Sequence, residues 1–165
     1  GSGLIAYAIL GYLSPVPIAL PQWKSRQYVP TLRAWGTPGS WYTADKQTSP
    51  GQPSDYYGKP VVLLTGPRSL SATDVFAETF RMMERGVIIG EPTGGSTGDP
   101  VSFALPGGGF GRVSTSANVG TALVGHGVQP QVLVPRTVED FLAGRDAALE
   151  RAVIELQRQA ARPGP

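Results

Sequence analysis

Residues 60–76 read PVVLLTGPRSLSATDVF, an apolar run followed by a turn and the start of an amphipathic segment. The run from Pro60 to Leu64 has no polar alternation, which is typical of a strand covered on both faces. Apolar residues then recur at helical spacing from Ala72 to Arg85, and Gly86 suits the left-handed position that ends a helix. This stretch therefore predicts a strand, a turn and a helix.

Ser71 opens the predicted helix, and two interpretations of it fit the residues. Ser71 and Asp74 have the spacing of a capping box, in which each side chain bonds to the backbone N–H of the other residue. A strand, a turn and a helix also form the geometry in which many hydrolases hold a nucleophilic serine. The spacing alone does not choose between a helix cap and a nucleophile.

A second buried strand, VIIGE at residues 87–91, follows the helix. Strand, helix and strand in this order form a βαβ unit, whose right-handed crossover makes the two strands parallel. The fold class is therefore α/β. Four further elements are predicted: a helix at residues 4–13, a β-hairpin at 101–116 that turns at Pro106–Gly109, a short helix between the Thr137/Asp140 capping box and Gly144, and a terminal helix from Asp146 with Leu149, Val153 and Leu156 facing inward.

Residues 15–60 differ in composition from the rest of the chain. They are rich in Pro, Gly and Ser, and they hold all three tryptophans and four of the six tyrosines. We expect mostly loop, with short edge strands around Gln27 to Val29 and aromatic side chains that pin the segment in place. Such an insertion serves either as a packed loop or as the rim of a substrate site or subunit contact.

The composition argues against several classes of function. A chain of 165 residues with 41% hydrophobic content fits one globular domain over residues 1–165, with a frayed tail at 161–165. The net charge of +2 arises without a basic stripe, so nucleic-acid binding gains no support. No segment approaches the ~20 apolar residues that span a membrane. With no cysteine and a single histidine, His126, we expect no metal cage and no cofactor.

Several landmarks occur in a fixed order: the turn TGPRSLSATD, the strand GVIIGEPTGG, the hairpin, the turn GHGVQPQVLVP and the helix GRDAALERA. Together they resemble the protease domain of the carboxyl-terminal processing (tail-specific) serine proteases over residues 1–13 and 58–160, with a loop closer to the tricorn-like branch. The resemblance implies a crotonase-like, ClpP-like ββα spiral with a mostly parallel core sheet. It also implies a C-terminal fragment of the protease domain, whose opening GSG lies within an oxyanion element.

The resemblance assigns roles to residues around the SATD motif. Ser71 corresponds to the nucleophile, and Asp74 stands where the family typically has glutamate. The backbone N–H of Ala72 can face the oxyanion that forms during acyl transfer. By resemblance, Gly1 or Gly3 supplies the second oxyanion donor.

The general base is not evident from the residues. Ser96 stands where the Ser–Lys branch of the family has its lysine, and Val124 stands where the tricorn-like branch has a supporting glutamate. The resemblance therefore implies that the base comes from outside this chain. His126, in a turn flanked by glycines, is an alternative base, weighed against an ordinary turn histidine.

These roles imply a serine endopeptidase that cleaves peptide or protein substrates through an acyl-enzyme on Ser71 and is inactive as an isolated fragment. The alternative is a non-catalytic module on the same fold that binds apolar ligands or peptides, which the missing lysine and glutamate favour. Relatives are often exported, so the resemblance favours the bacterial periplasm or secretion. The resemblance is also compatible with a homo-oligomer.

Overall fold

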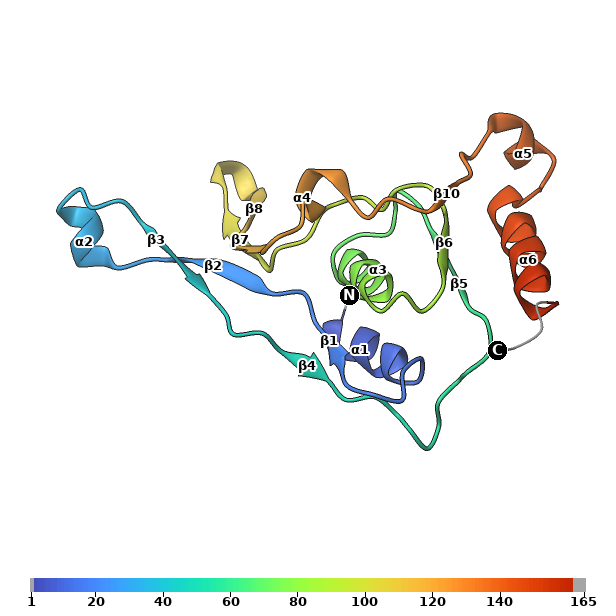
Figure 1. Cartoon of the computed structure of the whole chain (residues 1–165). Helices are drawn as coiled ribbons and strands as arrows, with labels where there is room; N and C mark the ends of the chain where they lie inside the picture. Colours follow the sequence, from blue (N-terminus) through green and yellow to red (C-terminus); the bar gives the residue numbers. More distant parts are fainter. Residues whose placement is uncertain (1, 162–165) are drawn as a thin grey trace.

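The structure is a computed structural model that describes residues 2–161. Its centre is a parallel three-stranded sheet in the order β10 (Val132–Leu133), β6 (Val87–Gly90) and β5 (Val62–Thr65) (Figure 1). Helix α3 (Ala72–Met82) connects β5 to β6, which lie parallel with Val62 opposite Val87. The predicted βαβ unit is confirmed.

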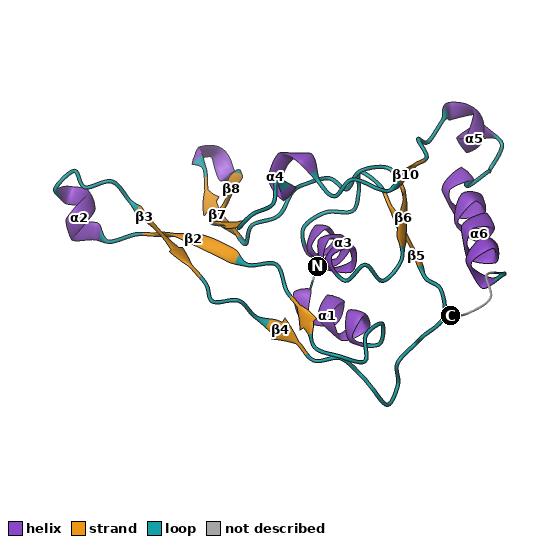
Figure 2. Cartoon of the chain, in the orientation of Figure 1, coloured by secondary structure: helices purple, strands orange, loops and turns teal. Residues whose placement is uncertain are grey.

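Helices cover both faces of this sheet. Helix α3 lies on one face and α6 (Ala147–Ala160) on the other, while α1 (Gly3–Gly11) packs against the outer side of α3 (Figure 2). The sheet is short because each strand has only two to four residues. Apolar side chains from both halves of the chain form one core, whose buried members are Leu10, Ile18, Ala77, Phe80, Ile88, Leu123 and Val128.

The inward face of α6 differs from the predicted one. Leu149 and Val153 are 50% and 45% exposed, whereas Ala152 is buried and Leu156 is half-buried. The helix contacts β5 and β6 along the stripe that contains Ala152, whose small side chain permits close approach to a narrow sheet. The prediction of Leu149 and Val153 as inward-facing was therefore wrong.

Residues 15–60 contain a long antiparallel hairpin, with loop between its short strands and from 50 to 60. Strands β1 (Ile18–Ala19) and β2 (Trp23–Gln27) run outward, and β3 (Ser40–Thr43) and β4 (Thr48–Ser49) return. Both pairings keep one register, from Ile18 opposite Ser49 to Gln27 opposite Ser40. A short helix, α2 (Pro30–Ala34), lies at the tip (Figure 1). We call residues 18–49 the arm.

The aromatic side chains of the arm do not pin it to the body. Tyr28 and Trp35 are 72% and 79% exposed, and α2 has no buried residue. Instead the arm is held at its base, where β2 pairs with β9 (Ser116–Asn118). The prediction that aromatic side chains pin this segment was wrong, because its strands are ordered by pairing with each other. Such long-range pairing leaves little signal in a Pro-rich and Gly-rich sequence.

The other predicted elements are present. The hairpin of β7 (Pro100–Ala104) and β8 (Phe110–Ser114) turns through the 3₁₀ helix η1 (Pro106–Gly108). Helices α4 (Leu123–His126) and α5 (Val138–Leu142) follow, and the Thr137 hydroxyl caps α5 by accepting from the Asp140 N–H. Among residues 2–161, every helix falls short of the length and apolarity needed to cross a membrane.

Candidate active site

Ser71 lies in the turn between β5 and α3 in a backbone conformation that ordinary helix caps do not use. Its φ is 59° and its ψ is −118°, whereas a capping residue normally has an extended backbone with negative φ. Positive φ is uncommon in residues other than glycine and costs about 1 to 3 kcal/mol. Strained turns of this kind, between a strand and a helix, expose nucleophilic serines in other hydrolases.

Asp74 stabilises this turn through hydrogen bonds to its carboxylate. It is fully buried, and its carboxylate accepts from the backbone N–H groups of Ser71 at 2.8 Å, Gly95 at 2.9 Å and Ser96 at 3.1 Å. The bond from the Ser71 N–H belongs to the predicted capping box, and the other two reach a loop twenty-one and twenty-two residues away. A buried carboxylate needs such charge-assisted partners. The capping spacing predicted the local bond, while nothing in the sequence predicted the two distant ones.

The loop at residues 91–98 is fastened to the Ser71 turn by its own backbone as well. The Ser71 N–H also donates to the Ser96 carbonyl at 2.8 Å, and the Gly94 N–H donates to the Ser69 carbonyl at 2.9 Å. A side chain on Gly94 would meet Leu70 and the Pro67 carbonyl, at 2.0 and 2.7 Å from the new carbon. Glycine is therefore required for the close approach of these two segments.

A third segment, residues 123–128, closes over the same loop. The Gly125 N–H donates to the Gly95 carbonyl at 2.8 Å, and the Val128 N–H donates to the Thr93 hydroxyl at 2.7 Å. Gly127 has φ 67°, and a side chain there would lie 2.0 Å from the Thr93 carbonyl oxygen. We call residues 65–74, 91–98 and 123–128 together the clasp.

Ala72 is one of the residues predicted to donate a hydrogen bond to an oxyanion. It is the first residue of α3, and within residues 2–161 its backbone N–H has no recorded partner. The first N–H groups of a helix are left without intrahelical acceptors, and the helix dipole places positive charge there. An N–H beside the Ser71 side chain is thus ready to receive an oxygen that gains negative charge.

The other predicted donors belong to the opening GSG. Gly3 is the first residue of α1, which packs against α3, but no hydrogen bond among the described residues joins Gly3 to the Ser71 turn. Gly1 lies outside the described residues. Burial, followed by the charge of Asp99, raises the pKa of the Tyr7 phenol in α1.

The His126 imidazole is not brought to Ser71 by any recorded contact. The side chain is exposed at the end of α4, and the carbonyl of His126 accepts from the Gln129 amide at 2.9 Å. The backbone of this turn, itself part of the clasp, bonds to Gly95, but no hydrogen bond within residues 2–161 involves the imidazole. This geometry fits an ordinary turn histidine.

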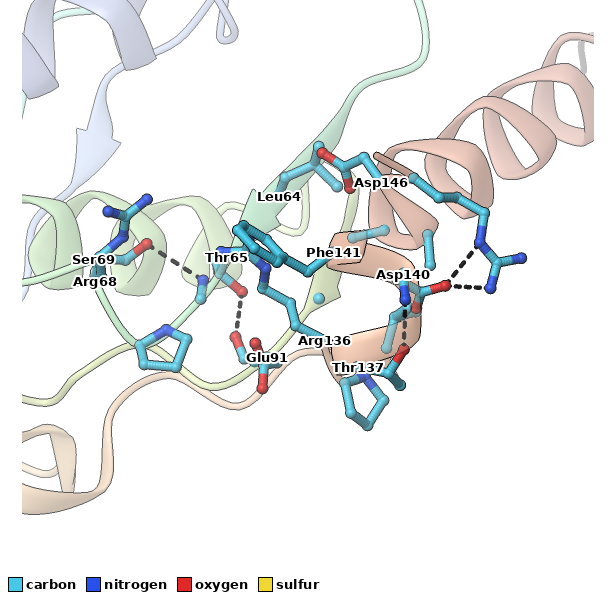
Figure 3. Close-up of a pocket in the computed structure, with 18 residues that line it drawn as sticks. Leu64, Thr65, Arg68, Ser69, Glu91, Arg136, Thr137, Asp140, Phe141 and Asp146 are labelled. Carbon is cyan, nitrogen blue, oxygen red and sulfur yellow. Dashed lines mark hydrogen bonds and ion pairs between the residues drawn. The ribbon is translucent and has the colours of Figure 1, made fainter. Parts of the chain in front are cut away.

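A cavity of about 490 Å³ lies beside the clasp at the carboxyl ends of the parallel strands (Figure 3). Strand ends, the turn at Gly66–Ser69, and helices α5 and α6 line it, with Leu64 and Phe141 among the apolar side chains. Ser69 faces this space, whereas Ser71 is not part of its lining. Ligands of open α/β sheets often bind at this edge of the sheet.

An ion pair lies in the part of the cavity lining that α5 and the start of α6 form. The Arg145 guanidinium donates to the carboxylate of Asp140, which Figure 3 labels at α5. The hydrogen bonds from Arg145 and then Thr137 hold the pKa of the Asp140 carboxyl below its usual value. This pair fixes α5 against the start of α6 and leaves Arg68, Arg136 and Glu91 as the other charged side chains of the lining, with Asp146 at the α6 cap.

The described residues thus bring together a strained serine, an adjacent backbone N–H without a hydrogen-bond partner, and a rigid support, and no hydrogen bond among them joins the serine to a base. No group of three or more His, Cys, Asp or Glu side chains within residues 2–161 is arranged to hold a metal ion. Acyl transfer by a serine needs a nucleophile, a base and oxyanion donors, and this arrangement includes candidates for the first and the last.

Comparison with known proteins identifies a family of peptidases. The profile of Peptidase family S41 matches residues 11–134, and no curated protein matches the sequence. The structure of a putative peptidase from Parabacteroides merdae is similar with a TM-score of 0.74 and 25% identity, covering 94% of this chain and 48% of that one. The chain therefore spans about half the length of that solved structure.

Two further solved structures share the fold. Mature CPAF has a TM-score of 0.73 and 18% identity, covering 98% of this chain and 43% of that chain. The photosystem II D1 C-terminal processing protease has a TM-score of 0.56 and 20% identity, covering 82% of this chain and 32% of that chain. These matches confirm the resemblance to carboxyl-terminal processing peptidases. Because the family profile covers most of its length, this chain belongs to peptidase family S41.

Proposed function

We propose that this chain is the nucleophile-bearing part of a serine endopeptidase, with Ser71 as the attacking residue. The observation that carries the proposal is the backbone of Ser71, with φ 59° at the start of α3, beside the free N–H of Ala72. A serine that served only as a cap would gain nothing from this strain. A nucleophile gains the exposure of its hydroxyl and an adjacent donor for the oxyanion.

In this mechanism the Ser71 Oγ attacks the carbonyl carbon of the scissile peptide bond, and a base takes the hydroxyl proton. The carbonyl oxygen becomes negative and accepts from the Ala72 N–H and from a second donor, for which Gly1 and Gly3 are the candidates. The C–N bond then breaks, and the base returns the proton to the leaving amine. Water attacks the acyl-enzyme by the same route and regenerates Ser71.

The base in this proposal comes from outside residues 2–161. Two observations support this: the imidazole of His126 has no recorded contact with the serine, and no lysine lies in the loop at residues 91–98. We assign the protein to the tricorn-like branch on the same grounds, with the ββα spiral as its architecture. The isolated chain is then expected to have little or no peptidase activity. The proposal also includes that the protein is exported and that it forms a homo-oligomer.

The test is labelling of the natural protein that carries these residues with a fluorophosphonate probe. We expect labelling that Ser71→Ala abolishes and Ser69→Ala preserves, since Ser69 lies in the same turn but faces the neighbouring cavity. Equal labelling of the wild-type protein and Ser71→Ala would rule out the assignment. Mass spectrometry of the labelled peptide identifies the modified residue directly.

A non-catalytic binding module is the second candidate, and the cavity beside the clasp is the observation that favours it. That cavity is lined partly by Leu64 and Phe141 and does not include Ser71. If it were the functional site, an apolar fluorescent probe such as a naphthalene sulfonate would bind the wild-type protein, and Phe141→Ala would weaken this binding while Ser71→Ala would not. Fluorophosphonate labelling of Ser71 would speak against this candidate.

A further inference from the structure

Strand β3 of the arm forms an unpaired edge of its sheet. Its three-stranded sheet has the order β3-β2-β9, so β3 has β2 on one side and, among residues 2–161, no strand on the other. All four residues of β3 are exposed. An exposed strand edge presents unpaired backbone groups that can pair with another extended chain.

The register identifies which backbone groups are free. The Ala44 N–H donates to the Trp23 carbonyl, so the even-numbered residues from Ser40 to Ala44 direct their backbone groups toward β2. The backbone groups of Trp41 and Thr43 therefore point away from β2. No partner is recorded for these two N–H and two C=O groups within the part of the chain that the structure describes. Two pairs of ladder hydrogen bonds are available on this edge.

One face of the sheet next to this edge carries positive charge, from two side chains of β2. Arg26 lies opposite Trp41 and Lys24 lies opposite Thr43, so their side chains share a face of the sheet. Both cations stack on the Trp41 ring, with Lys24 at 5.0 Å and Arg26 at 4.9 Å from its centroid. The ion pairs recorded among the described residues lie elsewhere, in the pairs Arg81–Glu78, Arg145–Asp140 and Arg158–Glu155.

The arm as a whole is cationic. Residues 18–49 contain Lys24, Arg26, Arg33 and Lys46 against Asp45, a net charge of +3, while the whole chain has +2, so the remainder has −1. A second copy of the chain would bring the same cations to the same edge and would be repelled. An extended partner with carboxylates on one face would instead complement both the free backbone groups and the charge.

We propose that the outer edge of β3 binds an extended acidic segment of the peptide substrate as an additional strand. Backbone groups of the segment pair with Trp41 and Thr43, and Asp or Glu side chains at alternate positions face Lys24 and Arg26. The inference rests on the proposed peptidase function for the identity of the ligand as substrate. It makes the arm an exosite that selects substrates by backbone extension and charge, apart from Ser71.

The first test measures binding to the Ser71→Ala chain by fluorescence anisotropy, so that no cleavage interferes. The probe is a short labelled peptide of alternating valine and glutamate. We expect it to bind with an affinity that falls as salt rises. Two matched peptides are the controls: one with lysine in place of glutamate, and one N-methylated at alternate residues so that it cannot donate to the strand edge. Neither is expected to bind measurably.

Variants of the arm separate the contribution of backbone hydrogen bonds to peptide binding from the contribution of charge. Thr43→Pro removes an outward N–H that β2 does not use, and proline is tolerated on strand edges. It is expected to weaken binding about fivefold, as for the loss of one hydrogen bond. The double variant Lys24→Gln with Arg26→Gln is expected to remove the salt dependence. Arg33→Gln, on α2 away from this face, is the matched charge control and is expected to leave binding unchanged.

The outcomes are distinct. Equal binding of the lysine peptide or of the N-methylated peptide to the wild-type arm would overturn the proposal, and this result does not depend on how any variant folds. A dimer that forms without peptide and disappears in Thr43→Pro would assign the edge to a second copy and would also overturn it. If the peptide binds but Ser71 is not labelled by the fluorophosphonate, the peptidase function alone is refuted. If Ser71 is labelled but the peptide does not bind, the strand-edge exosite alone is refuted.

Discussion

The clasp around Ser71 and the tip of the arm are both made of short connecting segments, and they are ordered in opposite ways. In the clasp, three segments far apart in the sequence bond to one another through Asp74, Thr93 and glycine backbones. At the tip, Trp35 is 79% exposed and nothing in α2 is buried. A rigid region suits a reaction that tolerates little misplacement, and an exposed one suits contact with a partner.

The largest expected effect is that of Asp74→Ala in the clasp. The change leaves the N–H groups of Gly95 and Ser96, on the loop that supports the serine, without their carboxylate, while the Ser71 N–H keeps the Ser96 carbonyl as acceptor. We expect the free energy of unfolding to fall by about 2 to 4 kcal/mol, as for the loss of charge-assisted hydrogen bonds around a buried carboxylate. Urea denaturation measures the change.

Asp74→Glu is the matched control for this prediction, because it keeps the charge and shifts the carboxylate by one methylene. It is expected to recover part of the stability and of the fluorophosphonate labelling of Ser71. A stability loss below about 1 kcal/mol for Asp74→Ala would show that the three hydrogen bonds do not hold the clasp.

A pair of glycines with positive φ compares the two regions. Gly127 in the clasp and Gly36 in the arm have φ values of 67° and 77°, but only Gly127 has a neighbour within 4 Å of an added side chain, the Thr93 carbonyl at 2.0 Å. We expect Gly36→Ala to lower the free energy of unfolding by about 1 kcal/mol, because alanine is strained at positive φ. Gly127→Ala is expected to lower it by about 2 to 4 kcal/mol, because the clash with Thr93 adds to the strain. Thermal denaturation of the two variants checks the difference. Equal losses would mean that residues 123–128 do not pack as closely as the structure shows.

The smallest expected effect has the opposite sign. Ser71→Gly relieves the strain of φ 59° at the candidate nucleophile and adds some entropy to the unfolded chain, for a net gain of about 1 kcal/mol in the free energy of unfolding. Ser71→Ala keeps the strain and is expected to be neutral. Chemical denaturation of both variants checks this prediction, and a destabilised Ser71→Gly would mean that the hydroxyl stabilises the fold.

The sequence predicted the central βαβ unit and the position of Ser71 because these features depend on local patterns. Uninterrupted apolar residues, helical spacing and the Gly86 stop each act over a few residues. The arm was predicted as loop, since pairing between β2 and β3 depends on contacts between segments about sixteen residues apart and not on the propensity of either. The face of α6 was misassigned because helical spacing allowed more than one stripe, and only the sheet selected Ala152.

By itself, the sequence determined the order of strands and helices, the serine at the start of a helix and the family to which the chain belongs. Only the tertiary structure decided that this serine is strained rather than an ordinary cap, that Asp74 bonds across the clasp, and that the arm is a hairpin with a free, cationic edge. The physical reason is range: capping and periodicity act between neighbours in the chain, whereas strain, cross-loop hydrogen bonds and strand pairing exist only once distant segments meet.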